Sequence, residues 1–198
     1  LSAGLGVLLA ASVAASADDP PAASRRDADL LKQKVAAIAR RGEEAQPSSK
    51  PLRTKVTENE VNAYLTHELA DTLPTGVVLP SVSIEGGGRV SGRAVVDLDR
   101  VRQEQKASSI FNPISYLKGR LAVVGTGSVR TGNGVARFQF ESASIAGVPI
   151  PKLLLQQIVA YYSRSEQYPS GIGLDDPFAL PARIREIQVE RGQAIVIQ

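Results

Sequence analysis

Residues 119–162 read GRLAVVGTGSVRTGNGVARFQFESASIAGVPIPKLLLQQIVAYY, and this stretch decides the fold of the chain. It contains two long runs in which apolar and polar side chains alternate, joined at Gly132-Asn133-Gly134. Alternation with a period of two predicts strands buried on one face, and the junction favours a tight hairpin turn. We therefore predict a curved antiparallel sheet folded over helices.

The patterns of these two strands contain a break in the alternation and two glycines on an apolar face. In the second strand the alternation slips near Ser142, which predicts a β-bulge. Glycine inside a strand leaves room for a close approach to the sheet or lets it bend. The first strand contains two glycines among the five residues expected on its apolar face: Leu121, Val123, Gly125, Gly127 and Val129.

An apolar helix is predicted directly after this hairpin. Pro151 stands at the first position of the helix, where proline is favoured. A helix that is apolar on most sides is either buried or lines a ligand site. The apolar residues of this helix are Leu153, Leu154, Leu155, Ile158, Val159, Tyr161 and Tyr162.

Residues 57–73 predict a second, amphipathic helix. The sequence Thr57-Glu58-Asn59-Glu60 is a capping box, in which the Thr57 hydroxyl and the Glu60 carboxylate each accept a backbone N–H at the helix start. Pro74 ends the helix. Because the box gives Glu58 and Glu60 structural roles, neither is expected to be catalytic.

Two more hairpins are predicted. Residues 77–85 and 89–99 pair across Gly86-Gly87-Gly88, and residues 184–190 and 194–198 form a hairpin that closes the sheet. Residues 101–115 connect strands as a loop, which is either a lip over a cavity or a segment packed on the core. One face of the 77–85 strand is expected to carry Val78, Pro80, Val82 and Ile84.

The N-terminal region indicates export. Residues 1–17 are apolar, uncharged and end in Ala15-Ser16-Ala17, which is typical of a signal peptide and its cleavage site. Residues 18–55 hold a helix over 24–41, capped by Ser24, and a linker, and residues 56–198 form the main domain. We expect a periplasmic or otherwise extracytoplasmic location in the cell envelope.

Composition excludes several function classes. The chain has no cysteine and a single histidine, His67, so thiolate chemistry and paired-histidine sites are ruled out. The formal net charge of +3 is dispersed, which argues against nucleic acid but permits peripheral contact with a membrane. Asp97 and Asp99 could bind a cation, but too few further oxygen ligands are spaced nearby. Asp175 and Asp176 could also hold a cation, and turn chemistry explains this pair equally well. We predict no catalytic residues, no metal and no cofactor.

The order of these elements resembles the tubular lipid-binding (TULIP) superfamily, and in particular its small bacterial exported YpmS-like and LmeA-like members. The resemblance rests on residues 56–65 (VTENEVNAYL), 144–150 (SIAGVPI) and 180–184 (LPARI). It implies an α+β fold with a curved antiparallel sheet wrapped around a long amphipathic helix, and the sequence patterns add a second apolar helix and an N-terminal accessory helix, the latter a departure from the family. It also implies a groove for acyl chains, with candidate residues Leu65, Leu69, Leu73, Val123, Gly125, Phe138, Phe140, Leu154, Ile158 and Tyr162.

Three functional hypotheses follow. The first is a non-enzymatic binding and transport protein for lipids or other hydrophobic small molecules in the cell envelope. The second is an envelope assembly protein with a packed core that binds a protein partner, whose identity the sequence does not give. The third is a hydrolase, which has little support because the chain has no G-x-S-x-G motif.

Overall fold

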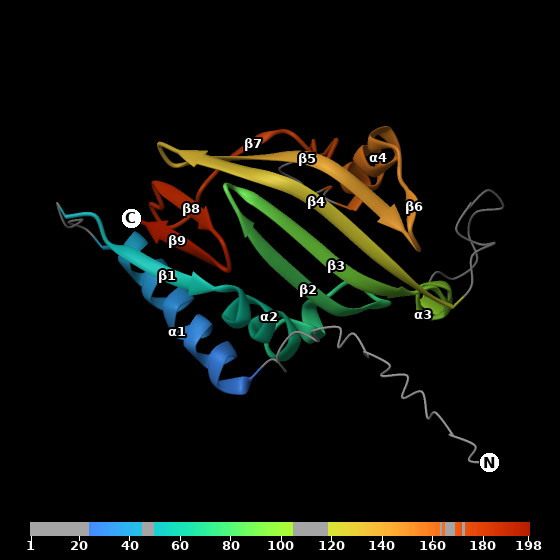
Figure 1. Ribbon diagram of the computed structural model, residues 1–198, viewed down its shortest axis with the longest axis horizontal. Helices are drawn as coiled ribbons and strands as arrows, with labels where there is room; N and C mark the ends of the chain where they lie inside the picture. The colour runs from blue at the N-terminus through green and yellow to red at the C-terminus, as the bar shows by residue number, and fades with distance from the viewer. Residues whose placement is uncertain (1–23, 45–49, 105–118, 163, 165–168, 172) are drawn as a thin grey trace, which may run out of the picture.

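The computed structural model describes residues 24–44, 50–104, 119–162, 164, 169–171 and 173–198. The fold is α+β, with helices packed against the edges and ends of two antiparallel sheets (Figure 1). The helices are α1 (Arg25–Gly42), α2 (Glu58–His67), α3 (Leu98–Glu104) and α4 (Lys152–Tyr162), with a 3₁₀ turn η1 (Ala70–Thr72). No helix in these ranges is long and apolar enough to span a bilayer.

The larger sheet contains six strands, four of which form two long hairpins. Its order is β2-β3-β4-β5-β6, and β7 also pairs with β5. The predicted bulge in the fifth strand is confirmed: Thr126 pairs with Ser142 whereas Gly127 pairs with Phe140, so Glu141 is the extra residue. The strands are β2 (Val77–Gly86), β3 (Arg89–Asp97), β4 (Arg120–Gly132), β5 (Val135–Ile145), β6 (Val148–Pro149) and β7 (Pro177–Ala179).

One predicted face of this sheet was partly wrong. The β2–β3 register shifts between Val78 and Ser81, so Val78 pairs with Val95 while Val77 pairs with Val96. Because directly paired residues share a face, Val77 lies with Val82 and Ile84, and Val78 lies on the opposite side. A shift of one residue in an irregular strand is enough to exchange the two faces.

From the sequence we expected the C-terminal hairpin to close the larger sheet, and this prediction was wrong. Strands β8 (Glu186–Glu190) and β9 (Gln193–Ile197) form a separate sheet with β1 (Arg53–Thr57), in the order β1-β9-β8. This hairpin lies across the turn end of the long hairpins (Figure 1) and is hydrogen-bonded to them. The Gly192 N–H donates to Ile84 O at 2.7 Å, and the Gly134 N–H donates to Arg185 O at 2.9 Å.

Helix starts were predicted better than helix ends. Ser24 caps α1 and accepts from the Asp27 N–H, and both hydrogen bonds of the Thr57–Glu60 capping box are present. The second helix, however, ends at His67 instead of Leu73. The Thr72 hydroxyl donates to Leu69 O in a 3₁₀ turn, and Pro74 favours an extended conformation at Leu73, so the chain turns back early toward β2.

The hydrophobic core lies where α1 meets the small sheet. Five buried side chains form one cluster: Leu31, Ile38, Val56, Ile184 and Val196. Val61 and Tyr64 of α2 pack against it, and α2 also contacts the edge strand β2. Helix α1 therefore belongs to the folded unit. The expected wrapping of the larger sheet around a long helix is not confirmed.

Side chains of α2 complete the exposed edge of β2. The Asn62 amide donates to Val82 O at 2.9 Å, and the Val82 N–H donates to Asn62 Oδ1 at 2.7 Å. The Ile84 N–H donates to the Glu58 carboxylate at 2.6 Å. A helix therefore supplies the hydrogen bonds that a neighbouring strand would otherwise make, which protects the sheet edge.

Candidate functional site

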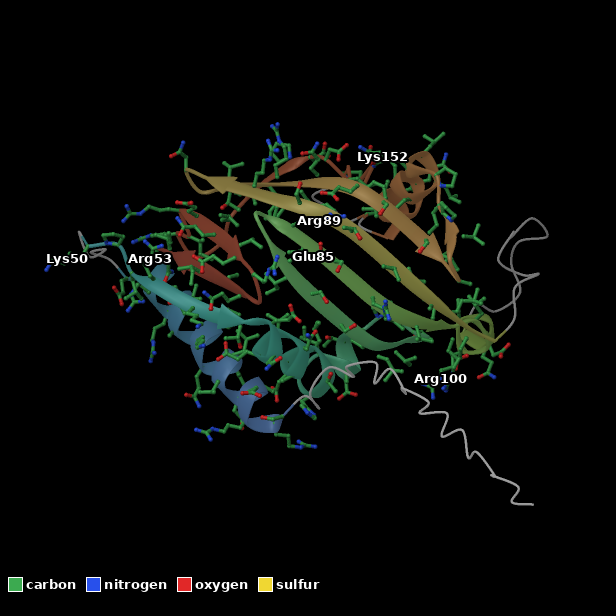
Figure 2. All side chains as sticks on the ribbon, in the orientation of Figure 1. Lys50, Arg53, Glu85, Arg89, Arg100 and Lys152 are labelled. Carbon is green, nitrogen blue, oxygen red and sulfur yellow. The ribbon has the colours of Figure 1, made fainter. Side chains whose placement is uncertain are left out.

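The larger sheet has one polar and one apolar face. Arg89 lies on the polar face near Glu85 (Figure 2), and its Nε is 3.3 Å from Glu85 Oε2. The same Nε is 3.1 Å from Glu141 Oε2. The other face, called here the apolar face, contains the directly paired residues Val77, Val82 and Ile84 of β2; Val90, Gly92, Ala94 and Val96 of β3; Leu121, Val123, Gly125, Gly127 and Val129 of β4; and Ala136, Phe138, Phe140, Ala143 and Ile145 of β5.

Much of the apolar face is only partly removed from water. Ile84, Ala136 and Ala143 are buried, with 6%, 1% and 8% of their surface exposed. The large side chains along its middle are half-buried among the described residues: Val82, Val90, Val96, Leu121, Val123, Val129, Phe138, Phe140 and Ile145. A sheet with a fully packed face would bury these residues, so this surface can accept further apolar atoms.

A row of small residues crosses the middle of the apolar face. Gly92 pairs with Gly125, and on either side of them lie Val82 and Ala143. A Cβ atom built on Gly92 or on Gly125 would meet no described atom within 4 Å. The surface of the sheet is therefore lowest at its centre, between the bulkier rows that contain Phe140 and Val123.

Gly127, the second glycine of β4, has a different role. A Cβ atom at this position would overlap Phe138 Cζ and would lie 2.8 Å from Gln139 O. Phe138 therefore covers Gly127, and the glycine is required for packing. The sequence indicated that both glycines could admit a close approach, and the structure separates an occupied position from an open one.

The turn end of the apolar face is covered by the C-terminal hairpin. The Thr131 hydroxyl donates to Ile187 O at 2.9 Å and accepts from the Ile187 N–H at 2.7 Å. Thr131 pairs with Ala136, which is buried to 1% exposure. Strand β8 therefore closes one end of the face, beyond Val129 and Phe138.

Helix α4 lies next to β5 and β6 (Figure 1). Lys152 Nζ is 2.5 Å from Asp175 Oδ2, and this hydrogen bond is the main reason that the pKa of Asp175 is lowered. The helix does not bury all its apolar side chains, because Leu153 is 72% exposed and Leu154 is 46% exposed.

The predicted groove residues fall into three groups. Val123, Gly125, Phe138 and Phe140 come together on the apolar face, and Leu65, Leu69 and Leu73 are half-buried in or just after α2. Leu154 is exposed on α4. The side chains of Ile158 and Tyr162, and the predicted loop beyond residue 104, lie outside the described part of the chain. Gly92, the partner of Gly125, was not among the predicted residues.

One residue of each acidic pair, Asp97 and Asp176, accepts structural hydrogen bonds. Asp97 is buried, and it accepts from the Arg100 N–H at the start of α3 at 3.2 Å and from Arg120 Nε at 3.2 Å. The predicted strand therefore ends at Asp97, and a short helix follows that we did not predict. Asp176 accepts from the Gly173 N–H within a turn at 2.7 Å. Among the described residues, no group of three or more potential ligands could hold a metal.

Comparisons with known proteins give little further guidance. No family model matches the sequence, and no curated protein matches it. Among solved structures, the chain is similar to one described as "Crystal structure of lipopolysaccharide binding protein", with 16% sequence identity and a TM-score of 0.22. The match covers 74% of this chain but only 40% of that chain. At this TM-score the likeness establishes neither the fold nor the function of this chain.

Proposed function

We propose that this chain is an exported, non-enzymatic protein of the cell envelope that binds a lipid, or another elongated hydrophobic molecule, on its apolar face. The observation that carries the proposal is the open row at Gly92 and Gly125, in the middle of a half-buried apolar surface. An alkyl chain laid across this row would approach the backbone of two strands closely. This arrangement also fits the groove that the resemblance to the TULIP superfamily implies.

The expected binding energy is hydrophobic. Burying a methylene group contributes about 0.8 kcal/mol, or about a fourfold change in affinity. Strand β4 has 13 residues, a length of about 43 Å at about 3.3 Å per residue. Affinity for saturated fatty acids should therefore rise with chain length until the accessible part of the face is filled.

Three described carboxylates, those of Glu58, Glu60 and Asp97, have structural hydrogen bonds, which supports a role without catalysis. Glu60 is buried at 6% exposure, completes the capping box and binds Lys34 Nζ through both oxygens at 2.6 and 2.8 Å. The Glu58 carboxylate accepts from the Ile84 N–H at the edge of β2, and the Asp97 carboxylate accepts from the Arg100 N–H at the start of α3. A carboxylate held by structural hydrogen bonds has little freedom to act as a general acid or base.

The experiment that tests this function is recovery of a bound lipid. Residues 18–198 would be purified from a host that contains membranes and examined by native mass spectrometry and by solvent extraction. A stoichiometric lipid, together with uptake of cis-parinaric acid, is the expected result. A mass equal to the polypeptide alone, with no uptake of the fluorescent acid, would overturn the proposal.

The alternative is an assembly protein that binds a protein partner, and one observation favours it. Val148 of β6 is 67% exposed and Leu153 of α4 is 72% exposed. Two apolar side chains that are close in sequence are therefore open to contact by a protein partner. Replacing Leu153 by Ser would weaken a partner complex but would leave cis-parinaric acid uptake unchanged if the ligand lies on the apolar face. This variant therefore separates the two functions.

A further inference from the structure

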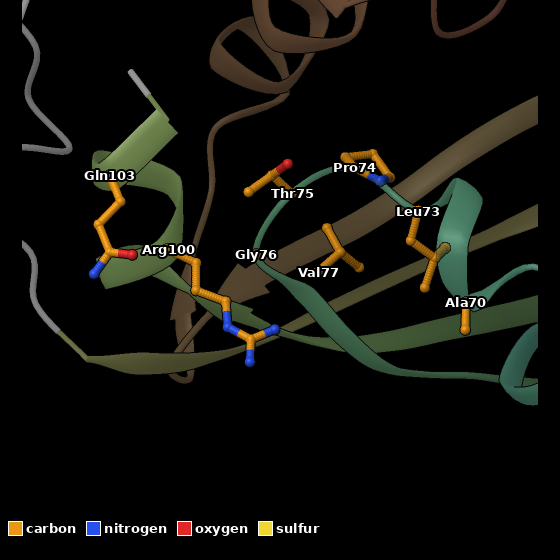
Figure 3. A pocket seen from close by; sticks show the side chains of 8 residues that line it. All are labelled: Ala70, Leu73, Pro74, Thr75, Gly76, Val77, Arg100 and Gln103. Atoms are coloured by element: carbon orange, nitrogen blue, oxygen red, sulfur yellow. The ribbon is translucent and has the colours of Figure 1, made fainter. Parts of the chain in front are cut away.

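A pocket of about 410 Å³, seen from close by in Figure 3, lies at the end of the larger sheet where β2 begins and α3 follows β3, away from the C-terminal hairpin (Figure 1). It is formed where the chain turns from η1 into β2 and where α3 follows β3. Its wall combines Ala70 and residues 73–77 with Arg100 and Gln103. The pocket was not predicted because these two segments are brought together by the β2–β3 hairpin.

The chemistry of the pocket is amphipathic. Ala70, Leu73 and Val77 provide apolar atoms, while Thr75 and Gln103 provide polar side chains. The remaining lining residues are Pro74, Gly76 and Arg100, and Arg100 is the one ionisable side chain among the eight. The pocket therefore presents a positive charge with no acidic side chain in its lining.

The guanidinium of Arg100 is available for a ligand. Its side chain is 62% exposed, and its Nε lies 3.9 Å from Asp97 Oδ2. The same carboxylate oxygen is 3.2 Å from Arg120 Nε. Because a guanidinium has five N–H donors, this distant interaction leaves Arg100 able to donate to another anion.

The pocket borders the apolar face at one residue, Val77. Val77 lines the pocket and also pairs with Val96 on the apolar face, and Val96 pairs with Leu121. From this row to the Gly92–Gly125 row is four residues along β3, or about 13 Å. An amphipathic molecule could therefore place its head in the pocket and its chain on the sheet.

We propose that this pocket binds the anionic head group, a carboxylate or phosphate, of an amphiphile whose alkyl chain occupies the apolar face, with Arg100 as the residue that selects the charge. This inference rests on the proposed function, because the chain site is the same. It adds a ligand class, namely anionic single- or multi-chain lipids in preference to neutral ones.

The test compares decyl phosphate with decanol, which share an alkyl chain and differ in charge. Displacement of Nile red, a neutral dye, would report binding to the wild-type protein and to Arg100→Gln. We expect Arg100→Gln to weaken decyl phosphate binding about tenfold and to change decanol binding less than twofold. Arg100→Lys, which keeps the charge, should retain most of the affinity for decyl phosphate.

The matched control is Arg93→Gln. Arg93 is exposed and pairs with Val124, on the polar face of the same sheet, so its replacement removes the same charge elsewhere. Both variants should unfold at the wild-type temperature. The Arg100 backbone N–H still donates to Asp97 in Arg100→Gln, and the Arg93 side chain is exposed.

Three outcomes would overturn the inference. The first is an unchanged ratio of decyl phosphate to decanol affinity in Arg100→Gln, and the second is an equal loss in Arg93→Gln. The third is inorganic phosphate binding as tightly as decyl phosphate, which would indicate an anion site unconnected to the apolar face. Failure of the proposed function is a separate result, because decanol would then not bind the wild-type protein.

Discussion

Gly92 and Gly125 face each other across β3 and β4, and no described atom lies within 4 Å of the Cβ position of either residue. Neither glycine has a positive φ, so the backbone does not require glycine at these positions. Glycine weakens a strand interior, and β-branched residues favour one. The pair therefore makes the sheet less stable than it could be, as expected when a position is kept open for a ligand.

Gly125→Val should raise stability and reduce binding. The valine enters open space in a strand, so the free energy of unfolding should rise by up to about 1 kcal/mol. Affinity for cis-parinaric acid should fall about tenfold, equivalent to lost contact with one or two methylene groups. Denaturant unfolding and fluorescence titration would measure the two effects.

Gly132→Val is the matched control for that experiment. Gly132 lies in the same strand, also has open space at its Cβ position, and is on the opposite face. Its replacement should leave fatty-acid affinity unchanged. Equal binding by Gly125→Val and Gly132→Val would show that the open row is not the chain site.

Gly127→Val should instead destabilise the protein. The new side chain would overlap Phe138 and the carbonyl oxygen of Gln139, so one of the two strands must move. Overpacking of this kind costs about 1–3 kcal/mol, which denaturant unfolding would detect. A Gly127→Val protein as stable as wild type would mean that Phe138 does not cover this glycine.

Asn62→Ala should uncover the edge of β2. The substitution removes both hydrogen bonds to the Val82 backbone, at a cost of about 1–3 kcal/mol in unfolding free energy. The unpaired strand edge should also promote self-association, visible by size-exclusion chromatography at increasing concentration. Asn59→Ala, an exposed change on the same helix, should have neither effect.

Asp97 should make stability depend on pH below its ordinary pKa of 3.8. The Arg100 backbone N–H is the main cause of its lowered pKa, and the Arg120 side chain adds to it. A lowered folded-state pKa means that the stabilisation is complete above 3.8 and is lost as pH falls through the folded value.

Asp97→Asn tests this pH dependence, because asparagine still caps a helix but carries no charge. The variant should be less stable than wild type at neutral pH, and the difference should shrink as pH falls from about 4 to about 2. Thermal unfolding across this range is the measurement. A stability difference that stays constant with pH would contradict the role given to the Asp97 charge. Asp71→Asn, which removes an exposed carboxylate, is the control.

The parts of the fold that depend on neighbouring residues could be predicted from sequence. The bulge at Glu141 and the capping box at Thr57 and Glu60 are each indicated by a few residues adjacent in sequence, and both are present in the structure. Strand β1 was missed because its five residues contain one buried side chain, Val56, and pair with β9 far along the chain. Its strand character comes from that long-range partner.

The candidate site shows the same division. Gly125 is recognisable as a glycine on an apolar strand face, but its partner Gly92 depends on the register between two separate hairpins. Arg100 lies in a polar segment that resembles a loop in sequence. Its position beside Leu73 follows from the helix cap at Asp97, which alternation alone does not reveal.

The pairing of β1 with β9 has a consequence for the order of events during synthesis. The central strand of the small sheet is residues 193–197, and it joins β1, made some 140 residues earlier, to β8. The core side chains Leu31, Ile38 and Val56 meet Val196 only when that strand is present. Contacts so distant in sequence slow folding, since a long loop must close first. The small sheet and its core would therefore form only after residues 193–197 had been made, whereas the two long hairpins of the larger sheet could pair before them.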